Sequence, residues 1–448
     1  MNLWARLKEL RRYPSAVIGL VVVGLLVLMS IYALIRYPYS EAIRLWRAGE
    51  LTWIENPRNA APFWYNWFGA DLPTTVKVGP EQARVVLEEN LGGGTRRRVL
   101  LLSFDYPWRK GFPQELALFY EGTFTRTPPQ AVLTWRTPDG REIPLGTQTL
   151  RGSGRYLISG DSVVAKRVGT EPRVGLFRDP WGGADGEGKA RALPGRYELW
   201  VDLYLFEPES TVSLKLVVYG QLHGWAGTDH LRRDITIALL WGGPIAIAFG
   251  MSAALILTFW YLTISAIGAW FGGWVDALID RLTELRMILP TLPILIMVGM
   301  FWSRSIWLIL AVIILLGLIG GSKGYRAMYL QARSFPYIEA ARAYGAGSMR
   351  IILRYLVPRF LPLVIPAFVS AIPSYVFLEA SLAILGLGDP LLPTWGKVIQ
   401  DAYSRGALFL GYYYWILIPG ALLLITGMGF AFVGFALDRI FNPRLRSL

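Results

Sequence analysis

The chain has 448 residues, of which 53% are hydrophobic, with a mean hydropathy of +0.38 and a formal net charge of +13. A soluble protein of this length would be about 45–50% apolar, so the composition favours a membrane protein. The absence of cysteine excludes disulfides, thiolate metal sites and cysteine nucleophiles, and the presence of only 2 histidines argues against a multi-histidine metal centre.

The first apolar run covers residues 16–35 and follows several basic residues. Its length meets the roughly 20 residues needed to cross a bilayer core. A secretory signal also has basic residues before an apolar run, but this run is long and no small-x-small cleavage site follows before Arg36. We therefore predict a cytoplasmic tail and a retained transmembrane helix in residues 1–36, with removal as a signal peptide as the alternative.

Residues 37–225 are polar, carry charges of both signs and are expected to form a soluble domain. Turn residues such as Pro138, Asp139 and Gly140 separate segments of strand length. Strands without intervening helical patterns predict a β-sandwich, here after a helical opening at 40–49. A glycine-rich run at 181–190 is the candidate for an exposed flexible loop. The expected strands are at 98–105, 115–121, 131–136, 196–207 and 211–220.

Residues 226–448 form the third block, which is mostly apolar. Thr228 and Asp229 precede its first span and are candidates to cap the first helical turn. Together with the span at 16–35, the block predicts a membrane all-α bundle of six transmembrane helices, with the β-sandwich-like domain inserted after the first. The five further spans are expected at 235–267, 287–302, 306–325, 361–387 and 413–437.

Basic residues gather on one side of this topology. They lie before the first span, in the loop between the fourth and fifth spans, and at the C-terminus, whereas the opposite loops carry only Arg304, Lys397 and Arg405. This positive-inside pattern predicts a multi-pass protein of the cell (inner) membrane with both termini in the cytoplasm and residues 37–225 outside. No basic stretch interleaves aromatic residues on a soluble face, so a nucleic-acid partner is disfavoured.

The cytoplasmic loop at 327–358 is the most informative part of the sequence. Residues 337–350 predict a short helix rich in small residues and a break at Gly345, and a second amphipathic helix runs to Pro358. Small residues would let another protein approach the helix backbone closely. A cytoplasmic loop packed on the lipid surface explains the same residues, and these features alone leave both interpretations open.

Glu339-Ala340-Ala341, followed by Gly345 and by Pro358 at the end of the second helix, resembles the EAA loop of ATP-binding-cassette importer permeases. In that family the loop forms the coupling helix that docks on the ATP-binding subunit. The resemblance implies an ATPase-coupling role for Glu339, Ala340, Ala341, Gly345, Ala346 and Ser348.

Three more stretches are similar to the C-type subunit of the peptide-type permeases, which serve dipeptide, oligopeptide and nickel importers. They are 227–234 (GTDHLRRD), 272–290, and 379–396, where Glu379-Ala380-Ser381-Leu382 begins the motif. The chain departs from this family at Arg232, where the family usually has glycine. It also departs in the length of residues 37–225, which the resemblance does not reach.

The resemblance implies the type I importer fold and a permease subunit that forms half of a pathway for peptides or similar small solutes. The implied partners are ATP-binding subunits, a second homologous permease subunit, an extracytoplasmic substrate-binding protein and membrane lipid. No nucleotide motif occurs in the chain, so no bound cofactor is expected here, and ATP and magnesium are expected on partner subunits. The chain would then be a transporter subunit and not an enzyme.

Two groups of polar residues are further candidate sites. Glu379, with Ser381 nearby, lies in a predicted span and would either line the pathway or make a structural hydrogen bond. The external segment that leads into the second span contains the other group: Thr228, Asp229, His230 and Asp234.

Asp276 and Asp280 stand four residues apart, like paired acid–base carboxylates. They lie beside Arg281 in a predicted cytoplasmic loop, so a solvated face or a partner contact is favoured. Three other classes of protein remain as alternatives: a sensor whose external domain does the main work, an envelope-modifying membrane enzyme, and an ion channel.

Overall fold

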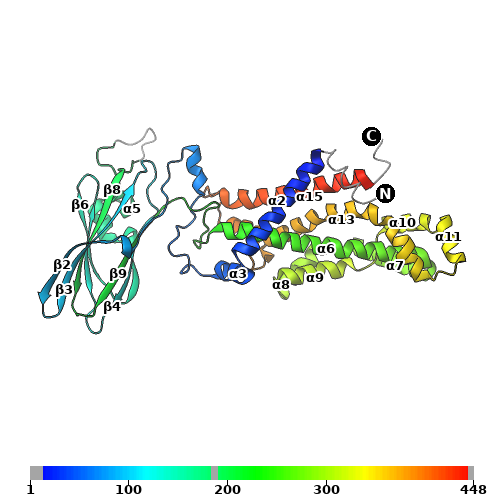
Figure 1. Cartoon of the computed structure of the whole chain (residues 1–448), viewed down its shortest axis with the longest axis horizontal. Coiled ribbons are helices and arrows are strands. Elements are labelled where there is room, and N and C mark those ends of the chain that lie inside the picture. The colour runs from blue at the N-terminus through cyan, green and yellow to red at the C-terminus, as the bar shows by residue number, and fades with distance from the viewer. Residues whose placement is uncertain (1–13, 183–189, 442–448) are drawn as a thin grey trace. The chain divides into compact units, whose positions relative to one another are not determined.

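The computed structural model describes residues 14–182 and 190–441. The glycine-rich run expected at 181–190 lies mostly outside the described residues, as do most of the basic residues near the two ends of the chain. The chain divides into two compact units (Figure 1), which we call the helical unit (Met1–Arg47 with Ile237–Leu448) and the sheet unit (Ala48–Thr236).

The sheet unit contains two antiparallel sheets. A four-stranded sheet has the order β1-β9-β4-β7, and a five-stranded sheet has the order β2-β3-β8-β5-β6. The strands are β1 Val76–Val78, β2 Arg84–Gly92, β3 Thr95–Tyr106, β4 Glu115–Thr123, β5 Gln130–Arg136, β6 Glu142–Thr149, β7 Ser153–Leu157, β8 Gly195–Leu205 and β9 Thr211–Tyr219.

One hydrophobic core joins the two sheets. Leu116 and Leu216 point into it from the four-stranded sheet, and Leu102, Leu133 and Leu199 point into it from the five-stranded sheet. Buried and exposed side chains alternate along β5 and β8, as they do in a strand with one face on a core. The unit is therefore a sandwich of two sheets.

The alternation of inward-facing and outward-facing side chains also explains which strands could be predicted from the sequence. The expected segments at 98–105, 115–121, 131–136, 196–207 and 211–220 coincide with β3, β4, β5, β8 and β9. The prediction missed β1, β2, β6 and β7. All nine residues of β2 are exposed, so this edge strand has no buried face to give it a pattern.

Within residues 14–182 and 190–441, four helices are long and apolar enough to cross a membrane, or five if a bent pair counts as one span. The four are Pro14–Arg36 (α2), Ile235–Phe271 (α6), the segment Ser348–Leu387 that contains α13 (Val357–Leu382), and Tyr414–Phe441 (α15). They correspond to the spans expected at 16–35, 235–267, 361–387 and 413–437.

The other two expected spans differ from the prediction. The stretch 287–302 is only the second half of a bent pair, in which Gly273–Ile288 (α7) and Thr291–Phe301 (α8) meet at 71° around Pro290. Proline lacks the N–H that would continue the helix. The stretch 306–325 forms the shorter apolar helix Ile306–Gly317 (α9), and Gly320 then adopts a left-handed φ of +80°. Twelve helical residues reach only about 18 Å, less than the roughly 30 Å of a bilayer core.

Close helix packing within the helical unit depends on glycine. A Cβ added at Gly19 of α2 would lie 2.8 Å from the carbonyl oxygen of Gly429 in α15. Such a distance would force the two helices apart, so the small residues permit their contact.

Shorter helices complete the helical unit. Tyr39–Arg47 (α3) realises the helical opening expected at 40–49 but belongs to the helical unit. The others are Lys323–Ala332 (α10), Pro336–Ala343 (α11), Ser348–Ile351 (α12) and Trp395–Ser404 (α14).

Candidate functional site

The segment at 336–356 contains α11, a tight turn, α12 and a π-helical stretch, Ile352–Leu356. Pro336 opens α11, where its missing N–H costs nothing. Gly345 ends the helix with a φ of +77°, and the N–H groups of Gly345 and Ala346 donate to the carbonyls of Arg342 and Ala341. A Cβ at Gly345 would meet no atom within 4 Å, so the backbone angle and not crowding favours glycine there.

One face of this segment is fixed to the rest of the helical unit. Ile338 is fully buried and packs in a cluster with Leu262, Trp270, Tyr329 and Ile352. The guanidinium of Arg342 lies 4.2 Å from the centre of the Trp270 ring. The segment is thus held by a hydrophobic contact and a cation–π contact.

The other face is open. Among the residues expected to couple to a partner, Glu339, Ala340, Gly345 and Ser348 are exposed. Tyr344 beside them is 92% exposed, an unusual state for a large aromatic side chain. Ala341, by contrast, is buried and Ala346 is half-buried, so these two small residues pack inward.

Ion pairs connect α10, which precedes this segment, to α7. Arg326 of α10 donates to the Asp276 carboxylate from Nε at 2.6 Å and from Nη2 at 2.5 Å. Lys323 Nζ lies 3.1 Å from a carboxylate oxygen of Glu284 and 4.0 Å from Asp280. Asp276 and Asp280 therefore pair with different cations and do not form an acid–base dyad.

Glu379 and Ser381 are both in α13 but have different surroundings. Glu379 is buried, and the hydroxyl of Thr394 caps α14 by accepting from the N–H of Lys397 at 3.1 Å. Ser381 is exposed, and its hydroxyl donates to the carbonyl of Phe377 one turn earlier at 2.7 Å. Both alternatives for Glu379, a place on the pathway and a structural hydrogen bond, stay predictions.

The segment that leads into α6 is a buried turn of the sheet unit. Thr228 Oγ1 donates to the Pro57 carbonyl at 2.7 Å and accepts from the Ala60 N–H at 2.9 Å. Asp229 is 1% exposed, and its carboxylate accepts from Nε of Arg233 at 2.6 Å. His230 is half-buried in the same turn.

The expected capping of α6 by Thr228 or Asp229 is wrong. Asp234, the residue directly before the helix, accepts from the N–H of Thr236 at 2.8 Å. Thr228 and Asp229 instead hold the turn closed, because their side chains bond to residues 57, 60 and 233.

Arg232 occupies the centre of this turn with a left-handed φ of +64°. Its side chain is 2% exposed, and its nitrogens reach Glu50 at 3.1 Å, Glu115 at 2.6 Å and the Asn56 carbonyl at 2.6 Å. The guanidinium also lies 4.8 Å from the centre of the Tyr219 ring. Glu115 and Tyr219 are paired residues of β4 and β9, so Arg232 fastens the turn to the four-stranded sheet.

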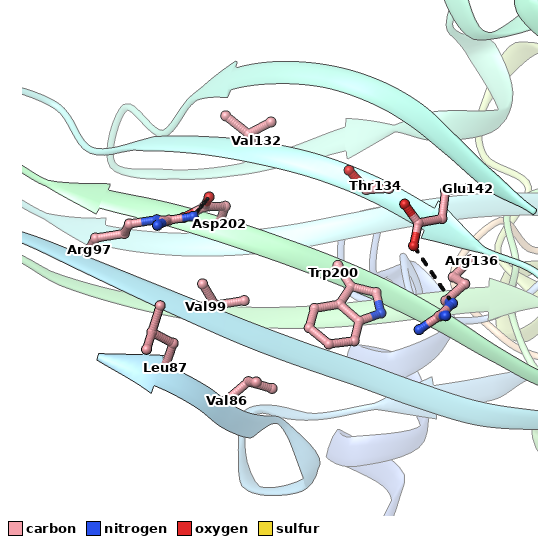
Figure 2. A pocket seen from close by; sticks show the side chains of 10 residues that line it. All are labelled: Val86, Leu87, Arg97, Val99, Val132, Thr134, Arg136, Glu142, Trp200 and Asp202. Atoms are coloured by element: carbon pink, nitrogen blue, oxygen red, sulfur yellow. Dashed lines mark hydrogen bonds and ion pairs between the residues drawn. The ribbon is translucent and has the colours of Figure 1, made fainter. Parts of the chain in front are cut away.

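The outer face of the five-stranded sheet carries an open groove of about 450 Å³ (Figure 2). Val99, Trp200 and Val132 form its floor, and the indole ring of Trp200 is seen face-on in the figure. The charges at its edges pair with one another: Arg97 with Asp202 at 2.7 Å and Arg136 with Glu142 at 3.8 Å. The groove is therefore amphipathic and close to neutral.

A second cavity, of about 240 Å³, lies in the helical unit at the bend between α7 and α8. Its polar lining consists of Tyr261, Arg286, Thr291 and Tyr375. The sequence analysis missed Arg286, although a basic residue directly before the apolar stretch 287–302 is a usable signal.

Metal chemistry receives no support from the described ranges. Within residues 14–182 and 190–441, no group of three or more histidine, aspartate or glutamate side chains could hold an ion. His223 is half-buried, and desolvation lowers its pKa.

Comparison with known proteins places the helical unit among transport proteins. Residues 261–447 match the family described as binding-protein-dependent transport system inner membrane component. The oligopeptide transport system permease protein OppC of Bacillus subtilis is 29% identical over 225 residues, which are 50% of this chain and 72% of the relative.

Two further relatives extend the comparison. The peptidoglycan transport system permease protein YejE of Agrobacterium fabrum is 31% identical over 229 residues, 49% of this chain and 57% of that protein. The dipeptide transport system permease protein DppC of Bacillus subtilis is 26% identical over 223 residues, 50% of this chain and 69% of the relative.

Proposed function

We propose, from the premise that this chain is a permease subunit of a peptide-type ATP-binding-cassette importer, that α11 and the Gly345 turn couple solute movement to a separate ATPase. The chain is the membrane component of such a system and not an enzyme in its own right. Permease components bind no cofactor themselves, and we place ATP and magnesium on partner subunits.

One observation carries the coupling role. The segment has one face fixed by Ile338 and Arg342 and one open face with Glu339, Ala340 and Tyr344. A helix that transmits force must be accessible to the partner and rigidly attached to the elements that move. The two faces of α11 meet both requirements.

The assembly follows from this role. ATP-binding subunits would dock on α11, and a second homologous permease subunit would complete the pathway, because one helical unit encloses little by itself. An external binding protein would deliver the solute. ATP binding would move the coupling segments and open the pathway outward, and hydrolysis would restore the inward-facing state.

The substrate class comes from the relatives. Their names state transport of oligopeptides, dipeptides and peptidoglycan, so we propose peptides or similar small solutes for this chain. Both termini and the segment 327–358 would lie in the cytoplasm, and the sheet unit would lie outside the inner membrane.

Substitutions on the open face of α11 test the coupling role. In the importer reconstituted with its partners, we expect Glu339→Arg and Gly345→Trp to abolish ATP-driven uptake while ATP hydrolysis continues and the chain still inserts. Glu339→Arg reverses the charge at the docking face. Gly345→Trp forces a large side chain into a left-handed backbone position. Uptake and ATPase rates are measured on the same proteoliposomes.

Glu142→Arg is the matched control, because it makes the same charge change at an exposed position of the sheet unit. It should leave uptake coupled to hydrolysis. Normal uptake in both α11 variants would contradict the proposal. Recovery of the chain without any ATP-binding subunit, under several mild detergents, would also count against it.

A further inference from the structure

Arg286 lies at the end of α7, where the chain bends into α8, and borders the 240 Å³ cavity of the helical unit. Apart from the four polar residues of the lining, the cavity wall is formed by leucine, isoleucine, methionine and glycine residues of α6, α7, α9 and α13. At about 30 Å³ for each water molecule, the space would hold about eight waters or the end of a peptide.

The positive charge of Arg286 has only neutral partners. Its Nη1 donates to the hydroxyl of Tyr261 at 2.7 Å, and its Nη2 donates to the Gly321 carbonyl at 3.1 Å. The guanidinium lies 4.6 Å from the centre of the Tyr261 ring. In the part of the chain that the structure describes, no carboxylate forms an ion pair with Arg286, and its buried Nε has no hydrogen-bond partner.

Two other cations of the helical unit have carboxylate partners. Arg326 has Asp276, and Lys323 has Glu284. A charge kept without a counter-ion among apolar side chains is costly, and such residues mark solute pathways. The hydroxyls of Thr291 and Tyr375 across the cavity add groups that can donate to an anion.

We propose that this cavity is an anion-binding site on the solute pathway, in which Arg286 receives a carboxylate of the passing solute. The inference rests on the proposed function for the identity of that solute as a peptide. The guanidinium supplies the positive charge, and the hydroxyls of Thr291 and Tyr375 orient the carboxylate. Tyr261 holds the guanidinium in place.

The natural absence of cysteine makes a direct test possible, because one introduced thiol reports one position. Thr291→Cys is made in the full chain and assembled with its partners in proteoliposomes. Labelling rates are compared for an anionic and a cationic methanethiosulfonate of similar size. We expect the anionic reagent to be favoured, and Arg286→Gln to lower the anionic-to-cationic ratio about tenfold.

Two further variants separate charge from structure. Arg286→Lys keeps the positive charge and should keep the anionic-to-cationic labelling ratio of the unsubstituted arginine. If Arg286 were purely structural, Arg286→Gln and Arg286→Lys would both leave this ratio unchanged. Leu315→Cys, an exposed position on α9 that does not line the cavity, should show a ratio that Arg286→Gln does not change. A Thr291→Cys thiol that neither reagent reaches, or an unchanged ratio, would overturn the anion site.

Solute recognition is measured on the same sample. Trialanine should slow the labelling of Thr291→Cys more than its C-terminal amide does, and Arg286→Gln should remove this difference. Equal protection by the two peptides would contradict carboxylate recognition. Failure of the unmodified importer to take up either peptide would instead refute the proposed peptide transport, while the reagent ratio still decides whether the anion site exists.

Discussion

Arg232 has a backbone conformation that favours glycine and a side chain that makes four separate contacts. A left-handed φ costs a residue with a Cβ about 1 kcal/mol relative to glycine, which accounts for the glycine usual in the related permeases. Here the guanidinium compensates by binding Glu50, Glu115 and the Tyr219 ring. Because all three belong to the inserted sheet unit, the substitution and the insertion are physically connected.

Substitution of Arg232 separates the two effects. We expect Arg232→Ala to destabilise the sheet unit by about 2 kcal/mol, since it removes the hydrogen bonds of the buried guanidinium to Glu50, Glu115 and the Asn56 carbonyl. Arg232→Gly should be about 1 kcal/mol less damaging than Arg232→Ala, because it relieves the backbone. Hydrogen exchange of β4 and β9 in the full-length protein measures both. Wild-type protection in Arg232→Gly would show that the side-chain contacts contribute nothing.

Glu379 shows how far a single residue can be interpreted from sequence. An intramembrane carboxylate is predicted to have either a functional or a structural role, and the sequence alone does not decide between the two. The structure buries Glu379 within α13. Arg286 is a different case, because its significance depends on a cavity that residues of five separate helices line.

At the scale of elements, ion pairs link α7 to α10, the helix that precedes the proposed coupling segment. The Arg326–Asp276 pair is bidentate, and Asp276 is only 14% exposed. This ion pair therefore contributes more to stability than a surface pair does. By contrast, the Arg281–Glu284 pair on the same helix has an arginine that is 82% exposed. Exposed pairs of this kind contribute about 0–1 kcal/mol.

Exchange of the two charges tests this link. We expect Asp276→Arg and Arg326→Asp each to lower uptake per ATP hydrolysed, because like charges would separate α10 from α7. The double exchange should restore most of the coupling. The same exchange at Glu41 and Arg44, an exposed pair within α3, is the control and should change little. Equal effects at both pairs, or no recovery in the double variant, would show that the contact does not transmit force.

At the scale of the whole molecule, the orientation in the membrane remains a prediction from charge. Arg151 lies in the sheet unit and Ser334 lies between α10 and α11, and both are exposed. In the cysteine-free chain, we expect Arg151→Cys to react with a membrane-impermeant thiol reagent. The reagent is added to cells from which the layers outside the inner membrane have been removed. Ser334→Cys should react only after the inner membrane is opened. The reverse pattern would place α11 outside and refute its role in coupling.

The sequence by itself predicted the similarity to importer permeases, the four long spans, five of the strands and the short helix that ends at Gly345. The structural features depend on local patterns: the length of an apolar run, alternation along a strand, and a glycine that ends a helix. The matches to transport-system permeases agree with the resemblance that these motifs indicated.

Only the tertiary structure decided the remaining features. It placed Arg232 against Glu115, 117 positions away in the chain, and left Arg286 without a carboxylate beside a cavity. It also made the expected span at 287–302 the second half of a bent pair and showed that Asp276 and Asp280 bind different cations. Such features depend on which side chains distant segments bring together, and no local periodicity encodes that choice.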